Sequence, residues 1–288
     1  MNELVSVYII THNRVDLLRR CVLSVINQSY QNLEIIIIDD ASNDDTKKYI
    51  KSINDTRIIY LRNESNQGAC YSRNRAINVA SGKFITGCDD DDYFEVNRVQ
   101  VFIENTELLK KHSLLFTHNK WLNKDGISNP VIDRFTKNIV TPKDLLPFNM
   151  IGNQIFCETT LVKNVLFDTD LPAWQDLDCW YRLLKKNNGT AIKVNHKTYI
   201  QDVSHEYGRI TTKRKEKILS AFDIFCKKNR LTKIEKIIVI NHLFSYKCKR
   251  VFFVVSSLVL LFTSLFDRFS IMLVLRNFKM AFLKKRVP

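Results

Sequence analysis

Residues 84–92 read Phe-Ile-Thr-Gly-Cys-Asp-Asp-Asp-Asp, an apolar run followed at once by four carboxylates. The apolar half is typical of a buried strand. Four like charges at a strand end repel one another and oppose folding unless a cation offsets them. Because residues two apart on extended backbone point the same way, Asp89 and Asp91 can share one face and join a hard divalent ion. A solvated acidic turn is the alternative for such a run in isolation, and the surrounding sequence favours the cation site.

Three further apolar runs precede this one, at residues 4–11, 33–38 and 57–61. Near-continuous apolar runs suit central strands that are buried on both faces. Helical patterns separate them: one after an expected N-cap at Asn13, one opened by Asp44, and one over residues 68–80. Strands that alternate with helices predict an open α/β sheet with right-handed crossovers.

Polar residues follow three of these expected strands at their carboxyl ends. They are residues 11–14 (Thr-His-Asn-Arg), residues 39–40 (Asp-Asp) and residues 89–92. In an open α/β sheet the ligand binds outside the carboxyl ends of the strands. Three such clusters in one half of the chain predict that the ligand site lies at this edge.

The middle of the chain is less regular. We expect a helix over residues 95–111, a strand over 114–117, a polar loop over 119–140 and a short helix capped by Thr141-Pro142. A helix over residues 175–186 and at least one strand within 190–203 follow. Beyond residue 212 all expected elements are helical. We therefore divide the chain into residues 1–210 and a helical region, residues 211–288.

The C-terminal region combines apolar segments with basic clusters. Residues 251–266 carry no charge but are shorter than the ~20 residues needed to cross a bilayer. Basic residues at 247, 249 and 250 precede this segment, and residues 284–286 form a second basic cluster near the end of the chain. Apolar segments beside basic clusters are typical of helices that lie on an anionic membrane surface. An ordinary helical hairpin packed on the core, or a true span, are the alternatives.

The net charge of +14 implies an anionic partner, such as nucleic acid, anionic lipid or a phosphorylated ligand. The cations concentrate late in the chain beside apolar runs, without a nucleic-acid motif, so no nucleic-acid partner is expected. Seven scattered cysteines without a CxxC motif favour a reduced compartment over disulfides or zinc.

The chain resembles the family 2 glycosyltransferases of the GT-A fold, a Rossmann-like open sheet that binds nucleotide-sugars. The matching stretches are VSVYIITHNR, LEIIIIDDASNDDT, NQGACYSRNRAINVASGKFITGCDDDDYF and WQDLDCWYRL, which together span roughly residues 4–210. As an ordered set they are highly specific, and they are most similar to bacterial enzymes that extend O-antigen or capsule units on a lipid carrier.

The resemblance implies where the nucleotide binds. Thr11, Asn13 and Arg14 lie in the loop that holds it, and Arg73 matches a residue near it. Asp40 matches the carboxylate that accepts from the uracil N3–H, which makes a uridine nucleotide such as UDP-Gal or UDP-Glc the expected donor. The alternatives are a carboxylate that stabilises a helix dipole for Asp40 and a surface cation for Arg73.

The acidic run matches the family's DxD motif. Asp91 would ligate Mn²⁺ or Mg²⁺, which bridges the donor diphosphate, and Asp89 would join it or hold the ribose with Asp90. Because all four positions are Asp, the motif can be aligned with them in two ways that differ by one residue. His205 would ligate the metal or touch the diphosphate, and Arg209 would pair with the diphosphate from a closing loop.

Gln175-Asp176 matches the family's Glu-Asp pair, with Gln at the first position. Asp176 would be the general base in an inverting displacement; a capping role is its alternative. Asp178 is a rival base. It lies two residues after Asp176, however, and therefore points to another face of the helix. The processive QxxRW motif is missing, which favours transfer of a single sugar.

The expected function is therefore transfer of one sugar to a hydroxyl of a polyprenyl-diphosphate-linked saccharide. It would take place at the cytoplasmic face of the bacterial inner membrane, with the enzyme peripheral or monotopic. A basic nucleic-acid-binding protein and a catalytically inactive scaffold are the alternatives, and the complete acidic and Gln-Asp motifs speak against the scaffold.

Overall fold

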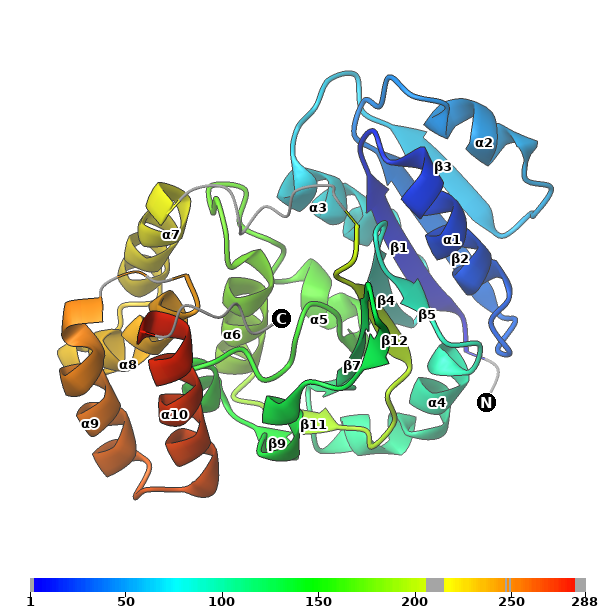
Figure 1. The fold of residues 1–288 in the computed structure, drawn as a ribbon. Coiled ribbons are helices and arrows are strands. Elements are labelled where there is room, and N and C mark those ends of the chain that lie inside the picture. The colour runs from blue at the N-terminus through cyan, green and yellow to red at the C-terminus, as the bar shows by residue number, and fades with distance from the viewer. Residues whose placement is uncertain (1–2, 206–214, 247, 249, 283–288) are drawn as a thin grey trace.

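The computed structural model describes residues 3–205, 215–246, 248 and 250–282. Within these ranges the chain forms a large mixed sheet covered by helices, a smaller sheet beside it, and a group of C-terminal helices (Figure 1). All seven cysteines are free thiols and buried.

The main sheet has eight strands in the order β3-β2-β1-β4-β10-β6-β11-β9. Their bounds are β1 Val5–Thr11, β2 Leu33–Asp39, β3 Ile58–Arg62, β4 Phe84–Asp89, β6 Leu114–Phe116, β9 Ile139–Val140, β10 Phe156–Glu158 and β11 Ala191–Lys193. Strands β1 to β4 are parallel, whereas β10 is antiparallel to β4 and β6. The chain runs outward from β1 to β3 and then returns to place β4 on the other side of β1, which creates the switch point where such sheets bind ligands.

Both faces of the main sheet are buried, as the apolar runs predict. Along β2, Ile36 and Ile38 belong to one core cluster, and Ile35 and Ile37 belong to a second on the opposite face. Helices α1 (Val15–Ile26), α2 (Thr46–Ser52) and α4 (Arg98–Glu104) contribute to the second cluster. Helices α3 (Ala69–Val79), α5 (Thr159–Lys163) and α6 (Gln175–Lys186) contribute to the first.

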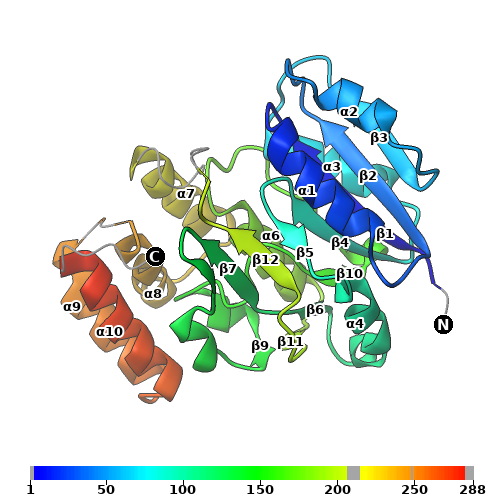
Figure 2. The same cartoon turned by 45° about the vertical axis from the view of Figure 1, so that its right-hand side comes forward.

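Residues 119–140 form structure where a polar loop is expected, and that expectation is wrong. The segment provides β7 (Asn119–Asn123), β8 (Gly126–Ser128), the 3-10 helix η2 (Val131–Arg134) and β9. With β5 (Tyr93–Phe94) and β12 (Tyr199–Asp202), two of these strands build a second sheet in the order β5-β12-β7-β8 (Figure 2). The pattern was missed because β8 is exposed and β7 only half-buried, so neither has a continuous apolar run.

Two other expected boundaries also shift. The helix expected over residues 95–111 is α4 followed by the 3-10 helix η1 (Thr106–Lys110). Asn13 is not an N-cap, because α1 begins at Val15 and Asn13 itself has a left-handed φ of 54°. The short helix η3 (Pro142–Leu145) is capped by Thr141 as predicted.

The described elements beyond residue 212 are all helical, as predicted. They are α7 Lys215–Lys228, α8 Lys233–Phe244, the 3-10 helix η5 Arg250–Phe252, α9 Phe253–Thr263 and α10 Arg268–Phe282. Leu243, Leu260 and Leu273 share the first core cluster with α6, so these helices pack directly on the rest of the chain. Over the described ranges, none of the helices combines the length and apolar character that crossing a bilayer requires.

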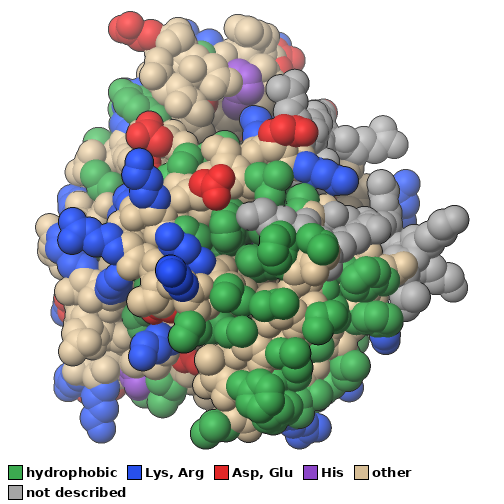
Figure 3. Space-filling model, turned by 90° about the vertical axis from the view of Figure 1, so that its left-hand side faces the viewer, with side chains coloured by type: hydrophobic (Ala, Val, Ile, Leu, Met, Phe, Trp, Pro, Cys, Tyr) green, Lys and Arg blue, Asp and Glu red, His purple; other side chains and the backbone are tan. Residues whose placement is uncertain are grey.

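Helices α9 and α10 present an apolar face to solvent. Figure 3 shows hydrophobic side chains gathered on this side of the molecule, with Lys and Arg near their edge. The exposed members include Val254, Leu258 and Phe262 on α9, and Leu275 and Phe278 on α10. We call these five side chains the apolar hairpin face.

Candidate active site

The acidic run turns sharply at the end of β4 and gathers its carboxylates. Oxygens of Asp89, Asp91 and Asp92 lie within 4.8 Å of one another. Three carboxylates around one point are the oxygen donors that a hard divalent cation prefers, so the chemistry of the set fits Mn²⁺ or Mg²⁺. Asp90 lies outside this trio.

Asp92 is held firmly from the second sheet. Its Oδ2 accepts from the Tyr199 hydroxyl at 2.7 Å and from Asn153 Nδ2 at 3.2 Å, and its Oδ1 accepts from the Asp202 backbone N–H at 2.9 Å. Burial, followed by repulsion from Asp91 and Asp89, raises its pKa well above the usual range for Asp. Asp92 therefore fixes the acidic turn to β12.

Asp89 is held by three side-chain donors, one of which, Asn153, also holds Asp92. Asn153 Nδ2 donates to its Oδ2 at 2.8 Å, and Gln154 Nε2 and Arg73 Nη2 reach its Oδ1 at 3.0 and 3.2 Å. Gly87 makes this approach possible, because a Cβ there would lie 2.2 Å from Gln154 Oε1.

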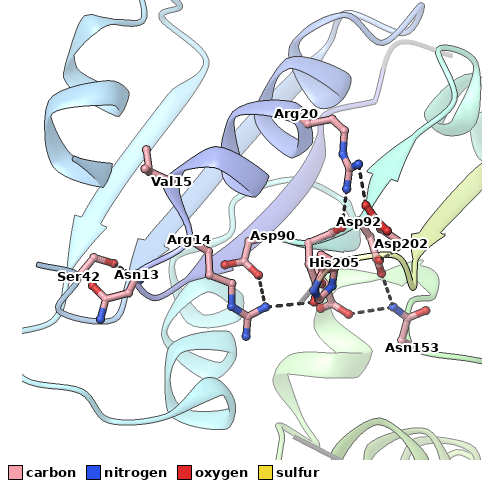
Figure 4. Close-up of polar contacts among 12 residues, drawn as sticks. Asn13, Arg14, Val15, Arg20, Ser42, Asp90, Asp92, Asn153, Asp202 and His205 are labelled. Carbon is pink, nitrogen blue, oxygen red and sulfur yellow. Dashed lines mark hydrogen bonds and ion pairs between the residues drawn. The ribbon is translucent and has the colours of Figure 1, made fainter. Parts of the chain in front are cut away.

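Arg14 sits between the remaining two carboxylates, with Nη1 3.1 Å from both Asp90 Oδ1 and Asp91 Oδ2 (Figure 4). Burial raises the pKa of Asp90 to about 7, although Arg14 acts in the opposite direction. Burial and then Asp89 also raise the pKa of Asp91. His205 Nε2 lies 3.3 Å from Asp91 Oδ2, so the structure brings these two expected site residues together.

A cavity of about 260 Å³ opens beside this cluster. The expected site residues that line it are Thr11, Arg14, Asp40, Arg73, Asp89, Asp90 and Asp91. Asp40 is buried there and accepts from Asn63 Nδ2 and the backbone N–H groups of Gln67 and Gly68 at 2.7–2.9 Å. These bonds hold its carboxylate as an oriented acceptor at the wall of the cavity.

Asn13 does not line the cavity. Its side-chain Oδ1 accepts from the Asn43 backbone N–H at 2.7 Å, and its own N–H donates to Ser42 Oγ at 3.0 Å. Asn13 thus joins the loop after β1 to the loop after β2, beside Arg14 (Figure 4).

Helix α6 begins beside the acidic cluster. Arg73 connects the two, because its Nη1 donates to Gln175 Oε1 at 3.0 Å while its Nη2 contacts Asp89. Asp176 is half-buried and accepts from Asn149 Nδ2 at 3.0 Å. Burial raises its pKa, while a backbone hydrogen bond from Leu177 acts in the opposite direction.

Asp178 faces away from the site. It is fully buried, and its Oδ2 lies 2.7 Å from Arg182 Nε and 3.7 Å from Lys228 Nζ. A carboxylate that is buried and paired in this way binds α6 to α7, and so the structure removes Asp178 as a rival base.

Comparison with known proteins agrees with this geometry. A family model described as "Glycosyl transferase family 2" matches residues 6–151. "Putative colanic acid biosynthesis glycosyl transferase WcaA" of Escherichia coli (strain K12) is 37% identical over 218 residues, which cover 75% of this chain and 78% of the relative. This chain belongs to glycosyl transferase family 2.

Two further proteins are similar to this chain. "UDP-Glc:alpha-D-GlcNAc-diphosphoundecaprenol beta-1,3-glucosyltransferase WfaP" of Escherichia coli is 28% identical, over 86% of this chain and 99% of the relative. The crystal structure of S. aureus TarS 1-349 in complex with UDP-GlcNAc aligns with a TM-score of 0.67 at 16% identity, over 96% of this chain and 90% of TarS. The chain is a glycosyltransferase with the GT-A fold.

Several residues of this family 2 site were missed by sequence analysis. Asn153, Gln154 and Tyr199 position the acidic run, and each comes from a segment distant from it in sequence. Isolated amides and a tyrosine carry no recognisable spacing, so the sequence offers no signal for them. Arg209 lies outside the described residues, and its expected contact with the diphosphate stays a prediction.

Proposed function

We propose that this glycosyltransferase is an inverting, metal-dependent enzyme that transfers one sugar from a UDP-sugar, such as UDP-Gal or UDP-Glc, to a hydroxyl of a lipid-diphosphate-linked saccharide. The observation that carries the proposal is the Arg73 bridge, which links Asp89 of the acidic cluster to Gln175 at the start of α6. It brings a carboxylate cluster suited to a diphosphate-bound cation close to Asp176, a half-buried carboxylate suited to proton acceptance.

The nucleotide occupies the cavity at the ends of β1 and β2 in this proposal. Asp40 supplies the acceptor for the uracil N3–H, and Thr11 and Arg14 line the same wall. Asn13 acts through the loop that positions Arg14. WfaP, which is named for the donor UDP-Glc, and TarS, solved with UDP-GlcNAc, support a uridine donor.

Asp89 and Asp91 would hold the cation, with His205 next to Asp91, while Asp92 keeps the turn in place. A bound Mn²⁺ or Mg²⁺ offsets negative charge on the departing diphosphate. Mannosyltransferase PcManGT from Pyrobaculum calidifontis, solved in complex with GDP-Man and Mn2+, aligns with a TM-score of 0.60 at 15% identity, over 99% of this chain and 76% of PcManGT. Its bound ion supports a metal in this fold.

Asp176 accepts the proton from the acceptor hydroxyl as that oxygen attacks the anomeric carbon. The new bond forms on the face opposite the donor diphosphate, the bond from the anomeric carbon to the diphosphate oxygen breaks, and UDP leaves with its electron pair. Arg73 holds the start of α6 against Asp89, which keeps the base close to the donor.

The acceptor and the apolar hairpin face together support action at a membrane surface, which we place on the cytoplasmic face of the bacterial inner membrane. WfaP is named for a diphosphoundecaprenol acceptor, and such a lipid cannot leave the bilayer. In this proposal residues 1–210 form the catalytic domain, and residues 211–288 hold it against the membrane.

The test combines transfer with nucleotide binding. Asp176→Asn keeps the size of the side chain but cannot accept a proton, so kcat should fall by roughly 10²–10⁴-fold. UDP with Mn²⁺ should raise the unfolding temperature of the variant as much as that of the wild type. EDTA should abolish transfer by the wild type, and the product of an α-linked donor should be β-linked.

Three results would contradict the proposal. Full activity in EDTA would rule out metal dependence. A product that retains the anomeric configuration would rule out the inverting mechanism, and a normal kcat in Asp176→Asn would rule out Asp176 as the base. Salt-sensitive retention on DNA without any UDP response would favour a nucleic-acid-binding protein instead.

A further inference from the structure

An apolar groove of about 580 Å³ lies between the second sheet and the last helix. One wall comes from residues 128–135, and the other from one face of α10, where Met272, Arg276 and Met280 recur at helical spacing. Ile132 and Phe135 contribute apolar surface opposite them. A volume of this size is typical of pockets that bury a drug-sized apolar ligand.

The charge on the groove is entirely positive. Arg276 and Lys279 line it, and none of its lining residues is acidic. The Arg276 guanidinium donates to Ser245 Oγ at 3.1 Å and stacks 5.4 Å from the Phe148 ring, but no carboxylate pairs with it among the described residues. A partly buried cation without a counter-charge costs free energy, which an anionic ligand would offset.

The groove adjoins the active site through the second sheet. Trp121 of β7 lines the groove, and Gln201 of β12 lines the catalytic cavity. The two residues are register partners in neighbouring parallel strands, so they lie about 4.8 Å apart across the sheet and share one face. In Figure 2, α10 lies on the far side of β7 from β12.

The groove also adjoins the apolar hairpin face. Leu275 is 53% exposed and belongs to both. A ligand that runs from the catalytic cavity past Trp121 and along α10 therefore reaches the surface proposed to contact the membrane.

We propose that this groove binds the acceptor's lipid carrier, with the first isoprene units against the apolar walls and the diphosphate near Arg276 and Lys279. The inference rests on the proposed function, which supplies an acceptor of this chemistry. An amphiphile with an apolar chain and an anionic diphosphate matches a groove that is apolar along its walls and cationic on α10. A phospholipid and a second copy of the chain are the other occupants that the test must separate.

Trp121 provides a direct readout of binding. It is only partly buried, whereas Trp174 is 6% exposed and Trp180 is fully buried, so a ligand in the groove should change the fluorescence of Trp121 alone. We would titrate the full-length protein with farnesyl diphosphate, farnesol, inorganic pyrophosphate and short-chain phosphatidylglycerol. The proposal expects a saturable response to farnesyl diphosphate that disappears in Trp121→Phe, a weaker response to farnesol, and none to pyrophosphate.

Two variants probe opposite walls. Lys279→Glu reverses the exposed charge on α10 and should weaken farnesyl diphosphate binding by about tenfold while leaving farnesol binding unchanged. Val131→Asp changes a side chain that is 65% exposed and should weaken binding of both isoprenoids. Lys48→Glu on α2 makes the same charge reversal away from the groove and should change nothing, and equal unfolding temperatures would show that all three variants fold.

Transfer assays then separate this inference from the proposed function. Val131→Asp should raise KM for an isoprenoid-linked acceptor but not for the same diphosphosaccharide on a short alkyl chain. Lys279→Glu should raise KM for both, because both acceptors carry the diphosphate. If the wild type uses both acceptors and Trp121 does not respond to farnesyl diphosphate, the groove proposal is wrong and the function stands. If farnesyl diphosphate binds as expected but no acceptor is used, the proposed function is wrong and the isoprenoid site stands. A Trp121 response to phosphatidylglycerol as strong as that to farnesyl diphosphate would show that the groove does not select the lipid carrier. Dimerisation through the groove without ligand would show that a second copy of the chain occupies it.

Discussion

Asp176 should control the pH dependence of the reaction, because it must be ionised to accept a proton. Burial raises its pKa above the ordinary value for Asp, so kcat should fall as the pH drops through that raised pKa. Asn149→Asp replaces the amide that donates to Asp176 with a second carboxylate, while Oδ1 still accepts from Ile151 and Gly152. The like charge should move the acidic limb of kcat upward by about one pH unit or more.

The matched control is Asn188→Asp, the same change at an exposed position at the end of α6. Its kcat profile should superimpose on that of the wild type. An Asn149→Asp profile that also superimposes would show that Asp176 is not the group whose ionisation limits the rate.

We expect two carboxylates of the acidic run to differ in role: Asp92 should stabilise the fold, and Asp91 should serve the reaction. Asp92→Ala leaves the Tyr199 hydroxyl and the Asp202 N–H without their acceptor, while Asn153 keeps Asp89, and should lower the free energy of unfolding by about 1–3 kcal/mol. Asp91→Ala relieves repulsion instead and should leave stability within about 0.5 kcal/mol of the wild type while abolishing transfer. Denaturant unfolding compares the two, and equal destabilisation would contradict the distinction.

At the residue scale, sequence analysis found the site where functional groups stand next to one another along the chain. Asp89, Asp91 and Asp40 follow apolar strands, and the structure places them at one edge of the sheet. Asn153 and Tyr199 join the site only because β10 and β12 pair with distant strands. That pairing depends on tertiary contacts, which no local pattern encodes.

At the scale of elements, the strands buried on both faces were predictable and the edge strands were not. All residues of β2 are buried, so its apolar run is continuous and unmistakable. The exposed β8 follows a turn at Lys124 and Asp125 and has no apolar alternation. Such strands form because they make backbone hydrogen bonds to a neighbouring strand, and their own amino-acid composition predicts them only weakly.

Helix α4 is anchored by a buried cation, which leads to a prediction about stability. The Arg98 guanidinium lies 4.8–4.9 Å from the rings of Phe94, Phe102 and Tyr199 and donates to the hydroxyls of Thr117 and Thr198. Burial lowers its pKa to about 10. No carboxylate pairs with it within the described residues.

Arg98→Lys should be more destabilising than Arg98→Met. Lysine puts a compact, strongly hydrated charge into an aromatic cage and cannot reproduce the planar stacking, whereas methionine fills the cage without a charge. We expect a difference in the free energy of unfolding of about 2 kcal/mol, measured by denaturant titration. A lysine variant at least as stable as the methionine variant would show that the cage tolerates any cation.

At the scale of the whole molecule, the C-terminal helices are joined to the catalytic part by a common core. Leu243, Phe244 and Leu260 belong to the cluster that also contains Trp180 and Leu183 of α6. Deleting the chain after Leu243 would therefore uncover buried apolar surface and destabilise the protein. A test of membrane binding must change the exposed face and leave the packed face intact.

Leu258 and Phe262 suit that test, because they lie four residues apart on α9 and are 49% and 65% exposed. Converting both to Glu should remove apolar contact and add repulsion from anionic lipid. The loss of two large side chains from the bilayer is worth roughly 3 kcal/mol or more, so partitioning should fall by about a hundredfold.

Flotation with vesicles of anionic phospholipid measures this partitioning. Val79→Glu with Val96→Glu changes two side chains that are 42% and 60% exposed and lie outside the apolar hairpin face, so this control should float with the wild type. The Leu258/Phe262 variant should stay in the soluble fraction and still transfer sugar to a short-chain acceptor, because its active site is unchanged. Flotation equal to that of the wild type would show that α9 does not contact the membrane, and its apolar side chains would then need another partner to cover them.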